Sequence, residues 1–219
     1  MMLREVVQVA KRAMVPGGSR YRRIPIGPAA GCVMNLDLHH QMRLFLGIYE
    51  AELRPYFSEL IHRGAKCFDI GGRDGYDALV LAKLSGGRVV SVECDREPAT
   101  SMRETFARNS YPIEVVEKFV CDREDATHTT LDRLATEIFI PTFIKMDIEG
   151  AEADALRGAR GLLGGTRPPF IIEVHGEEVE SECVEILAEY RYKIQVVPQR
   201  RWFKEVRPLA HNQWLVCRP

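Results

Sequence analysis

The sequence predicts an α/β fold, with a doubly wound, mostly parallel sheet of seven strands and an N-terminal helical cap. Three observations predict it. From about residue 66, strand-like runs alternate with helical segments, which is the pattern of βαβ units. Most of the runs are continuously apolar, as expected of strands covered on both faces. Finally, 219 residues, 46% of them hydrophobic and 28% charged, suit one large domain with an appendage.

The expected elements follow one another in a regular order. Strands are expected at 66–70, 88–93, 113–120, 143–147, 169–175, 192–197 and 212–217. Helices are expected at 75–84, 97–109, 151–163 and 177–192. No convincing helix separates the last two strands, so we expect them to pair in the antiparallel direction.

The N-terminal segment, 1–62, is expected to form a cap on a domain that spans 63–219. Residues 3–14 carry apolar side chains at helical spacing, and a stretch rich in Gly and Pro follows. Residues 40–64 are expected to be helical, with an interruption near Pro55. The cap would cover a site or form the surface of a homodimer, and the sequence does not decide between these roles.

Composition argues against several classes of protein. The formal net charge of −1 gives no bias toward nucleic acid or an anionic membrane. No apolar run approaches the ~20 residues of a membrane helix, and residues 1–23 lack the apolar segment of a secretory signal. The six cysteines are scattered without a CxxC pair, so we expect buried free thiols in a cytoplasmic protein.

The segment FDIGGRDGYDAL joins the first expected strand to the first expected helix. Gly71, Gly72 and Gly75 would permit a tight turn and a close approach of a ligand to the backbone, at the sheet edge where α/β folds bind ligands. The segment is not the dinucleotide fingerprint, because Arg73 occupies the position of the central glycine. A nicotinamide-dependent oxidoreductase is therefore disfavoured, and a purely structural turn remains an alternative.

Acidic residues narrow the choice of ligand. Asp69 and Asp74 would repel a pyrophosphate but favour a ligand with an ammonium and a sulfonium, and S-adenosylmethionine carries both. Glu93 ends the second strand, where a carboxylate can bind both ribose hydroxyls. Asp122, after the third strand, would accept a bond from the adenine amino group. Each acid alone also suits a solvated strand end or a helix cap, but three at successive strand ends favour a cofactor site.

Several motifs together resemble the FkbM-type family of class I S-adenosylmethionine-dependent methyltransferases. They are IGPAAG, GIYEAEL, FDIGGRDGY, FIKMDIEGAEADALRGA, FIIEVH and HNQWLVC, and they extend over residues 24–216. The resemblance implies a Rossmann-like, seven-stranded sheet whose last strand is antiparallel. It also implies methyl transfer, usually to a hydroxyl of a sugar, polyketide or other small molecule.

The resemblance assigns the cofactor loop to Asp69, Gly71 and Gly75, ribose binding to Glu93, and a position near the methionine end of the cofactor to Asp147. The full set that we expect at the cofactor is Tyr49, Glu50, Asp69, Gly71, Gly72, Gly75, Tyr76, Glu93, Cys94, Asp122 and Asp147. The chain departs from the family where Gly72-Arg73 replaces Ala-Asn and Cys94-Asp95 replaces the residues Glu-Pro that often follow this strand. We expect Arg73 to turn outward or to pair with Asp74.

The chemistry is expected at the ends of two neighbouring strands. Because side chains alternate along a strand, Lys145 and Asp147 share one face, and so do Glu173 and His175. We predict that His175 is the general base for an acceptor hydroxyl, that Glu173 orients it or binds substrate, and that Lys145 also takes part in catalysis. A divalent cation on Asp147 and Glu173 is an alternative that we do not favour, and a structural His175 is another.

Two further acids and one competing function complete the sequence-based picture. Glu152 is expected mainly to stabilise the first turn of a helix, and Glu149 is ambiguous. The favoured function is methylation of a small molecule, without nucleic acid or membrane partners. The alternative is a non-catalytic module that binds S-adenosylmethionine, and it depends on the unusual Arg73.

Overall fold

The computed structural model describes residue 15 and residues 17–198 and 212–219. The helix expected at 3–14 and the loop at 199–211 lie outside the described residues. None of the helices in the described part combines the length and apolar character needed to cross a bilayer.

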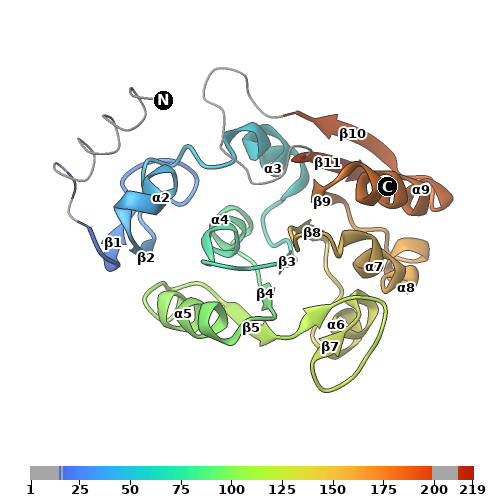
Figure 1. Cartoon of the computed structure of the whole chain (residues 1–219), viewed down its shortest axis with the longest axis horizontal. Helices are drawn as coiled ribbons and strands as arrows, with labels where there is room; N and C mark the ends of the chain where they lie inside the picture. Colours follow the sequence, from blue (N-terminus) through green and yellow to red (C-terminus); the bar gives the residue numbers. More distant parts are fainter. Residues whose placement is uncertain (1–14, 16, 199–211) are drawn as a thin grey trace.

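A seven-stranded sheet, in the order β10-β11-β9-β8-β3-β4-β5, forms the centre of the fold (Figure 1). Its strands are β3 (Cys67–Ile70), β4 (Val89–Glu93), β5 (Ile113–Glu117), β8 (Phe143–Met146), β9 (Phe170–His175), β10 (Lys193–Val197) and β11 (Asn212–Arg218). All neighbours pair in parallel except β11, which is antiparallel to both β9 and β10. The predicted mostly parallel sheet with an antiparallel last strand is confirmed.

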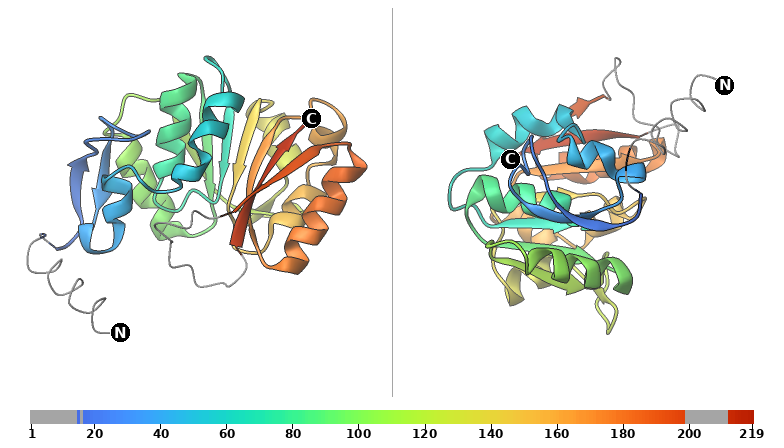
Figure 2. Two further views of the ribbon diagram at one scale, coloured as in Figure 1. Left: turned by 90° about the horizontal axis from the view of Figure 1, so that it is seen from above. Right: turned by 90° about the vertical axis from the view of Figure 1, so that its left-hand side faces the viewer.

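Helices cover the sheet on both faces, which makes three layers (Figures 1 and 2). One face packs against α3 (Arg54–Leu60), α4 (Tyr76–Ser85) and α5 (Arg96–Phe106). The other packs against α6 (Leu131–Glu137), α7 (Glu152–Arg157), α8 (Arg160–Gly164) and α9 (Glu177–Glu189). Strand residues alternate between the two cores: Cys67 belongs to the first and Phe68 to the second.

The described part of the N-terminal segment packs against the α4 face of the sheet. It contains a hairpin, β1 (Arg20–Arg23) with β2 (Val33–Leu36), then α2 (Leu38–Phe45) and the 3-10 helix η1 (Ala51–Leu53). The hairpin was not predicted, because its strands are short and flanked by Gly and Pro. It is joined to the turn after α5 by the side chain of Asn109, which accepts from the N–H of Val33 and donates to its C=O. The expected helix at 40–64 breaks before Pro55, which lies in the first turn of α3.

Two expected elements of the main domain are divided. The strand expected at 113–120 ends at Glu117, and β6 (Phe119–Val120) pairs instead with β7 (His128–Thr129) in a separate small sheet. The helix expected at 151–163 breaks between α7 and α8, where Gly158 lies so close to the C=O of Cys121 that a Cβ would be 2.2 Å from that oxygen. Helix α6 was missed, although Thr130 caps it by accepting from the N–H of Arg133.

The cysteine prediction is confirmed except at one position. All six thiols are free, and five are buried. Cys94 is exposed, because it directly follows the carboxyl end of β4.

Candidate active site

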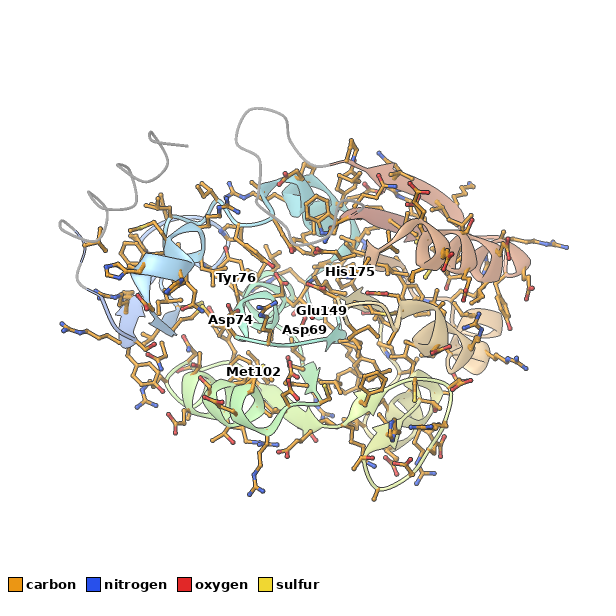
Figure 3. All side chains as sticks on the ribbon, viewed as in Figure 1. Asp69, Asp74, Tyr76, Met102, Glu149 and His175 are labelled. Atoms are coloured by element: carbon orange, nitrogen blue, oxygen red, sulfur yellow. The ribbon has the colours of Figure 1, made fainter. Side chains whose placement is uncertain are left out.

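A cleft of about 380 Å³ lies at the carboxyl ends of β3, β4 and β8. The chain order reverses between β3 and β8, so this is the switch point at which open α/β sheets bind ligands. The charged residues that line it are Arg73, Glu93, Asp95, Lys118, Asp147 and Glu149. Figure 3 shows Asp69, Glu149 and His175 grouped near this edge, at the centre of the molecule.

The glycines of the first loop are required by close packing. Gly71 has φ +90°, and a Cβ there would lie 1.8 Å from the C=O of Asp147. A Cβ on Gly72 would lie 2.2 Å from the hydroxyl of Ser91. Gly75 adopts φ +81° at the start of α4, with Phe106 2.8 Å from the position of a Cβ. The loops after β3 and β8 are thus in backbone contact.

Glu93 has the position predicted for ribose binding. Its carboxylate accepts from the N–H of Arg73 and from the N–H of Asp95, each at 2.9 Å, and it lines the cleft together with Cys94. Phe119 and Val120 provide an apolar wall further along. Asp122 is exposed and does not line the cleft, because the chain leaves the main sheet before this residue, so the geometry does not support its predicted bond to adenine.

Asp69 lies beneath the glycine loop and is fully buried. One carboxylate oxygen accepts from the hydroxyl of Ser91 at 2.7 Å, and the other is buried without a hydrogen-bond partner among the described residues. Burial and the nearby Asp77 raise the pKa of Asp69 to about 7. An unpartnered buried carboxylate next to the cleft suits the ammonium of S-adenosylmethionine, and Glu93 suits its ribose.

Arg73 and Asp74 do not pair with each other. The guanidinium of Arg73 turns outward and lies 3.1 Å from the carboxylate of Glu149, on the loop after β8. Asp74 accepts from the N–H of Tyr76 and from the side chain of Gln41, both at 3.2 Å. Asp74 therefore connects the first residue of α4 to α2, and Arg73 has the outward orientation that was one of its two expected arrangements.

Lys145 is buried beneath the site. Its Nζ lies 2.8 Å from the carboxylate of Asp77 and 3.4 Å from that of Asp147. Burial opposes the charged form, but Asp77, Glu50 and Asp147 outweigh it and raise the pKa of Lys145 well above its ordinary value. Only 1% of the side chain is exposed, so Lys145 balances charge here and does not face the cleft.

Tyr49, Glu50 and Tyr76 gather near Lys145, outside the cleft lining. The rings of Tyr49 and Tyr76 meet edge to face with centroids 5.7 Å apart. Glu50 is 2% exposed, so its carboxylate is buried next to the charge of Lys145. These three residues lie on the side of Lys145 that the N-terminal segment covers.

His175 is held by a partner that the sequence did not predict. Its Nδ1 lies 2.8 Å from the carboxylate of Glu152, whereas its Nε2 lies 3.6 Å from one oxygen each of Asp147 and Glu173. Burial lowers the pKa of His175, but the hydrogen bond that its ring donates to Glu152 and the charge of Asp147 outweigh this effect, so the pKa is raised above 6.5. Only 8% of the ring is exposed.

Glu152 lies in the first turn of α7, as expected, but it has a second role that the sequence did not predict. Its carboxylate is fully buried and also accepts from the N–H of Gly150, at 3.1 Å, so it turns inward from the first turn of α7. Glu173 instead accepts from the indole N–H of Trp214 at 3.0 Å. Glu152 therefore orients the imidazole, and Glu173 lies across from it. An acid two residues after Gly150 is compatible with this inward orientation, but the same pattern also indicates the start of a helix, so the sequence alone did not distinguish the two roles.

Asp147, Glu173 and His175 are brought together as predicted. Each offers one ligand atom, and the three atoms lie within 4.8 Å of one another, a spacing that suits a divalent cation. Asp147 also lines the cleft. The cleft and the group formed by Asp147, Glu173 and His175 therefore share the carboxylate of Asp147.

The arrangement of this sheet is that of the class I S-adenosylmethionine-dependent methyltransferases. Within it, residues 108–194 match the family model of the methyltransferase FkbM domain. This match and the fold support an FkbM-type class I methyltransferase, which confirms the resemblance predicted from the motifs. No match is found among curated proteins.

Three solved structures illustrate the likeness. A methyltransferase FkbM from Methylobacillus flagellatus has 18% identity and a TM-score of 0.57, over 99% of this chain and 59% of that chain. Fibrillarin from Aeropyrum pernix, with natively bound S-adenosyl-L-methionine, has 13% identity and a TM-score of 0.55, over 73% of this chain and 68% of that chain. A tRNA (uracil-54, C5)-methyltransferase from Pyrococcus abyssi, in complex with S-adenosyl-L-homocysteine, has 15% identity and a TM-score of 0.59, over 92% of this chain and 44% of that chain. At these identities the likeness establishes the fold alone.

Proposed function

We propose that the chain transfers the methyl group of S-adenosylmethionine to a hydroxyl of a small molecule, with His175 as the general base. One observation carries the proposal. The Asp147 carboxylate that lines the cleft lies 3.6 Å from Nε2 of a histidine whose other nitrogen is fixed by a buried glutamate. A bound cofactor supplies an electrophilic methyl group, and the neighbouring residues prepare the nucleophile.

His175 is suited to take the acceptor's proton at Nε2. The bond between Nδ1 and Glu152 leaves Nε2 as the basic nitrogen and fixes the plane of the ring. When Nε2 gains the proton, Asp147, Glu152 and Glu173 offset the new positive charge. A positioned base of this kind typically contributes 10²–10⁴-fold in rate. Most of the remaining acceleration is expected from alignment of the reacting atoms.

We further propose that 1–62 acts as a cap that completes the acceptor pocket of the domain 63–219. Its described part places Tyr49 and the buried Glu50 close to Lys145 and Asp77, on the same face of the sheet as His175. A surface for a homodimer remains a second role for this segment.

The test combines cofactor binding with turnover. His175→Ala is expected to retain its affinity for S-adenosylhomocysteine in titration calorimetry, because His175 does not line the cleft. Methyl transfer to a panel of sugars and other hydroxylated metabolites should fall by ~10²–10⁴-fold. Undiminished turnover in this variant would eliminate His175 as the base.

A metal-assisted reaction at Asp147, Glu173 and His175 is the second candidate, favoured by the spacing of their ligand atoms. Turnover that is lost with a chelator and restored by Mg²⁺ or Mn²⁺ would support it. Binding of S-adenosylhomocysteine without turnover on any hydroxylated acceptor would instead support a non-catalytic module.

A further inference from the structure

Two cationic side chains line the cleft among the residues that the structure describes, Arg73 and Lys118. Lys118 precedes Phe119, at the end of the cleft that suits the adenine, and its Nζ donates to the C=O of Asp125 at 3.0 Å. Arg73 follows the glycine loop, and its guanidinium lies 3.1 Å from Glu149 at the end near Asp147. The two cations therefore lie toward different ends of the cleft.

Lys145 also carries a positive charge near that end, but this charge is already paired with buried carboxylates. Lys145 is 1% exposed and lies between Asp77 and Asp147. The guanidinium of Arg73, by contrast, belongs to a side chain that is 79% exposed, and its partner Glu149 is 72% exposed. An exposed ion pair of this kind stabilises a protein by only ~0.2–1 kcal/mol, so Arg73 can exchange Glu149 for another carboxylate at little cost.

The backbone fixes where this exchange can occur. Arg73 has φ +45° and Glu149 has φ +52°, both in the left-handed region that residues other than glycine rarely adopt. The N–H of Arg73 donates to Glu93 at 2.9 Å, so the Cα of Arg73 is held beside the acid expected to bind ribose. From this point the side chain extends toward the loop after β8, along the path between a ribose on Glu93 and the carboxylate of Asp147.

We propose that Arg73 binds the α-carboxylate of the methionine moiety of S-adenosylmethionine, and that Glu149 holds the guanidinium in the absence of the cofactor. This inference rests on the methyltransferase function proposed above. The acids of the site suit the ammonium and the sulfonium, but the carboxylate of the same ligand requires a cation. A guanidinium matches a carboxylate through two parallel N–H donors. Arg73, which departs from the family pattern, would thus supply the positive charge that binds the carboxylate of the cofactor.

The test separates the carboxylate from the rest of the ligand. Titration calorimetry of the full chain would use S-adenosylhomocysteine and its decarboxylated analogue, 5′-deoxy-5′-(3-aminopropylthio)adenosine. Arg73→Asn removes the charge and keeps a residue that tolerates the left-handed backbone. Arg73→Lys keeps the charge but not the planar fork. Arg103→Ala is the matched control, because it removes a similar exposed ion pair, with Glu117 at 3.3 Å, outside the cleft lining.

Arg73→Asn is expected to weaken binding of S-adenosylhomocysteine by ~10–100-fold, the range for a hydrogen bond to a charged group, and to leave the analogue unaffected. Arg73→Lys should lose less affinity than Arg73→Asn, and only for S-adenosylhomocysteine. Arg103→Ala should change the affinity for neither ligand. Equal weakening of both ligands would overturn the proposal, since Arg73 would then merely support the loop. Unchanged binding of S-adenosylhomocysteine would also overturn it. A wild-type chain that binds neither ligand would overturn the proposed function as well.

Discussion

The contact between His175 and Glu152 can be tested by one isosteric substitution, Glu152→Gln. The amide oxygen can still accept from Nδ1–H, which in the wild type faces a carboxylate at 2.8 Å. The negative charge is lost, however, and Glu152 is fully buried, so solvent does not screen the difference. The substitution therefore separates the charge of Glu152 from its role in positioning the ring.

The size of the effect follows from the type of hydrogen bond. A bond to a charged group contributes about 1.5–3 kcal/mol and a neutral bond about 0.5–1.5 kcal/mol. The exchange therefore costs the imidazolium form about 1.4 kcal/mol relative to the neutral form, which corresponds to about one pH unit. The pKa of His175 is raised above 6.5 in the wild type, and we expect it to fall by about one unit in Glu152→Gln.

Ring chemical shifts followed by NMR from pH 5 to 9 would measure this pKa without knowledge of the acceptor. His175→Gln identifies the resonance among the six histidines. Asp154→Asn is the control, because Asp154 lies in the same first turn of α7 but faces Arg157 at the surface. If the pKa of His175 is the same in Glu152→Gln as in the wild type, Glu152 does not set the basicity of the ring and the reasoning fails.

The same substitution has a consequence for stability with a defined sign. A histidine whose pKa is raised by folding stabilises the protein below its unfolded value, and this contribution is lost as pH rises through the folded pKa. The free energy of unfolding of Glu152→Gln should therefore differ most from that of the wild type at acidic pH. The difference should shrink above the folded pKa of His175.

Two further predictions concern the cofactor loop. Gly71→Ala should abolish binding of S-adenosylhomocysteine and lower the melting temperature far more than Gly64→Ala. Both positions have positive φ, but a Cβ at Gly71 would lie 1.8 Å from the carbonyl oxygen of Asp147, whereas a Cβ at Gly64 has nothing within 4 Å. Gly64→Ala therefore costs only the backbone strain of an alanine at positive φ, about 1–2 kcal/mol. Asp69, with its pKa raised from 3.8 to about 7, should release a proton when an ammonium binds at pH 6. Calorimetry in buffers of different ionisation enthalpy would detect the proton, and Asp69→Asn should eliminate it; similar melting of the two glycine variants, or proton release from Asp69→Asn, would contradict these predictions.

The sequence predicted the main sheet well because each strand carries its own evidence. An apolar run with an acid at or next to its end, as with Glu93 in β4 and Asp69 in β3, indicates both the strand and the sheet edge at which it ends. The prediction of one strand over 113–120 was wrong, because the chain leaves the main sheet after Glu117. The hairpin β1–β2 could not be predicted, because its four-residue strands depend on contacts with α5 and with the turn after it, which are distant in sequence.

The site was predicted in its strand residues and missed in its helix residues. Alternation along a strand places Lys145 with Asp147 and Glu173 with His175, and the structure brings all four to one face. Asp77 and Glu152 come from the first turns of α4 and α7, where an acid is also explained by the helix dipole. Their inward orientation depends on the angle at which each helix packs, which no local pattern encodes.

The register of the central strands divides the polar residues into two layers with different roles. Ser91, Asp69 and Lys145 are cross-strand neighbours on β4, β3 and β8, and all three are buried. Two residues further along the same strands and loops come Glu93, Gly71 and Asp147, which line the cleft. The lower layer contacts the upper one through the pair of Lys145 with Asp147. A one-residue slip of β8 would turn both Lys145 and Asp147 to the opposite face, so the cofactor cleft and the histidine cluster depend on the same strand register.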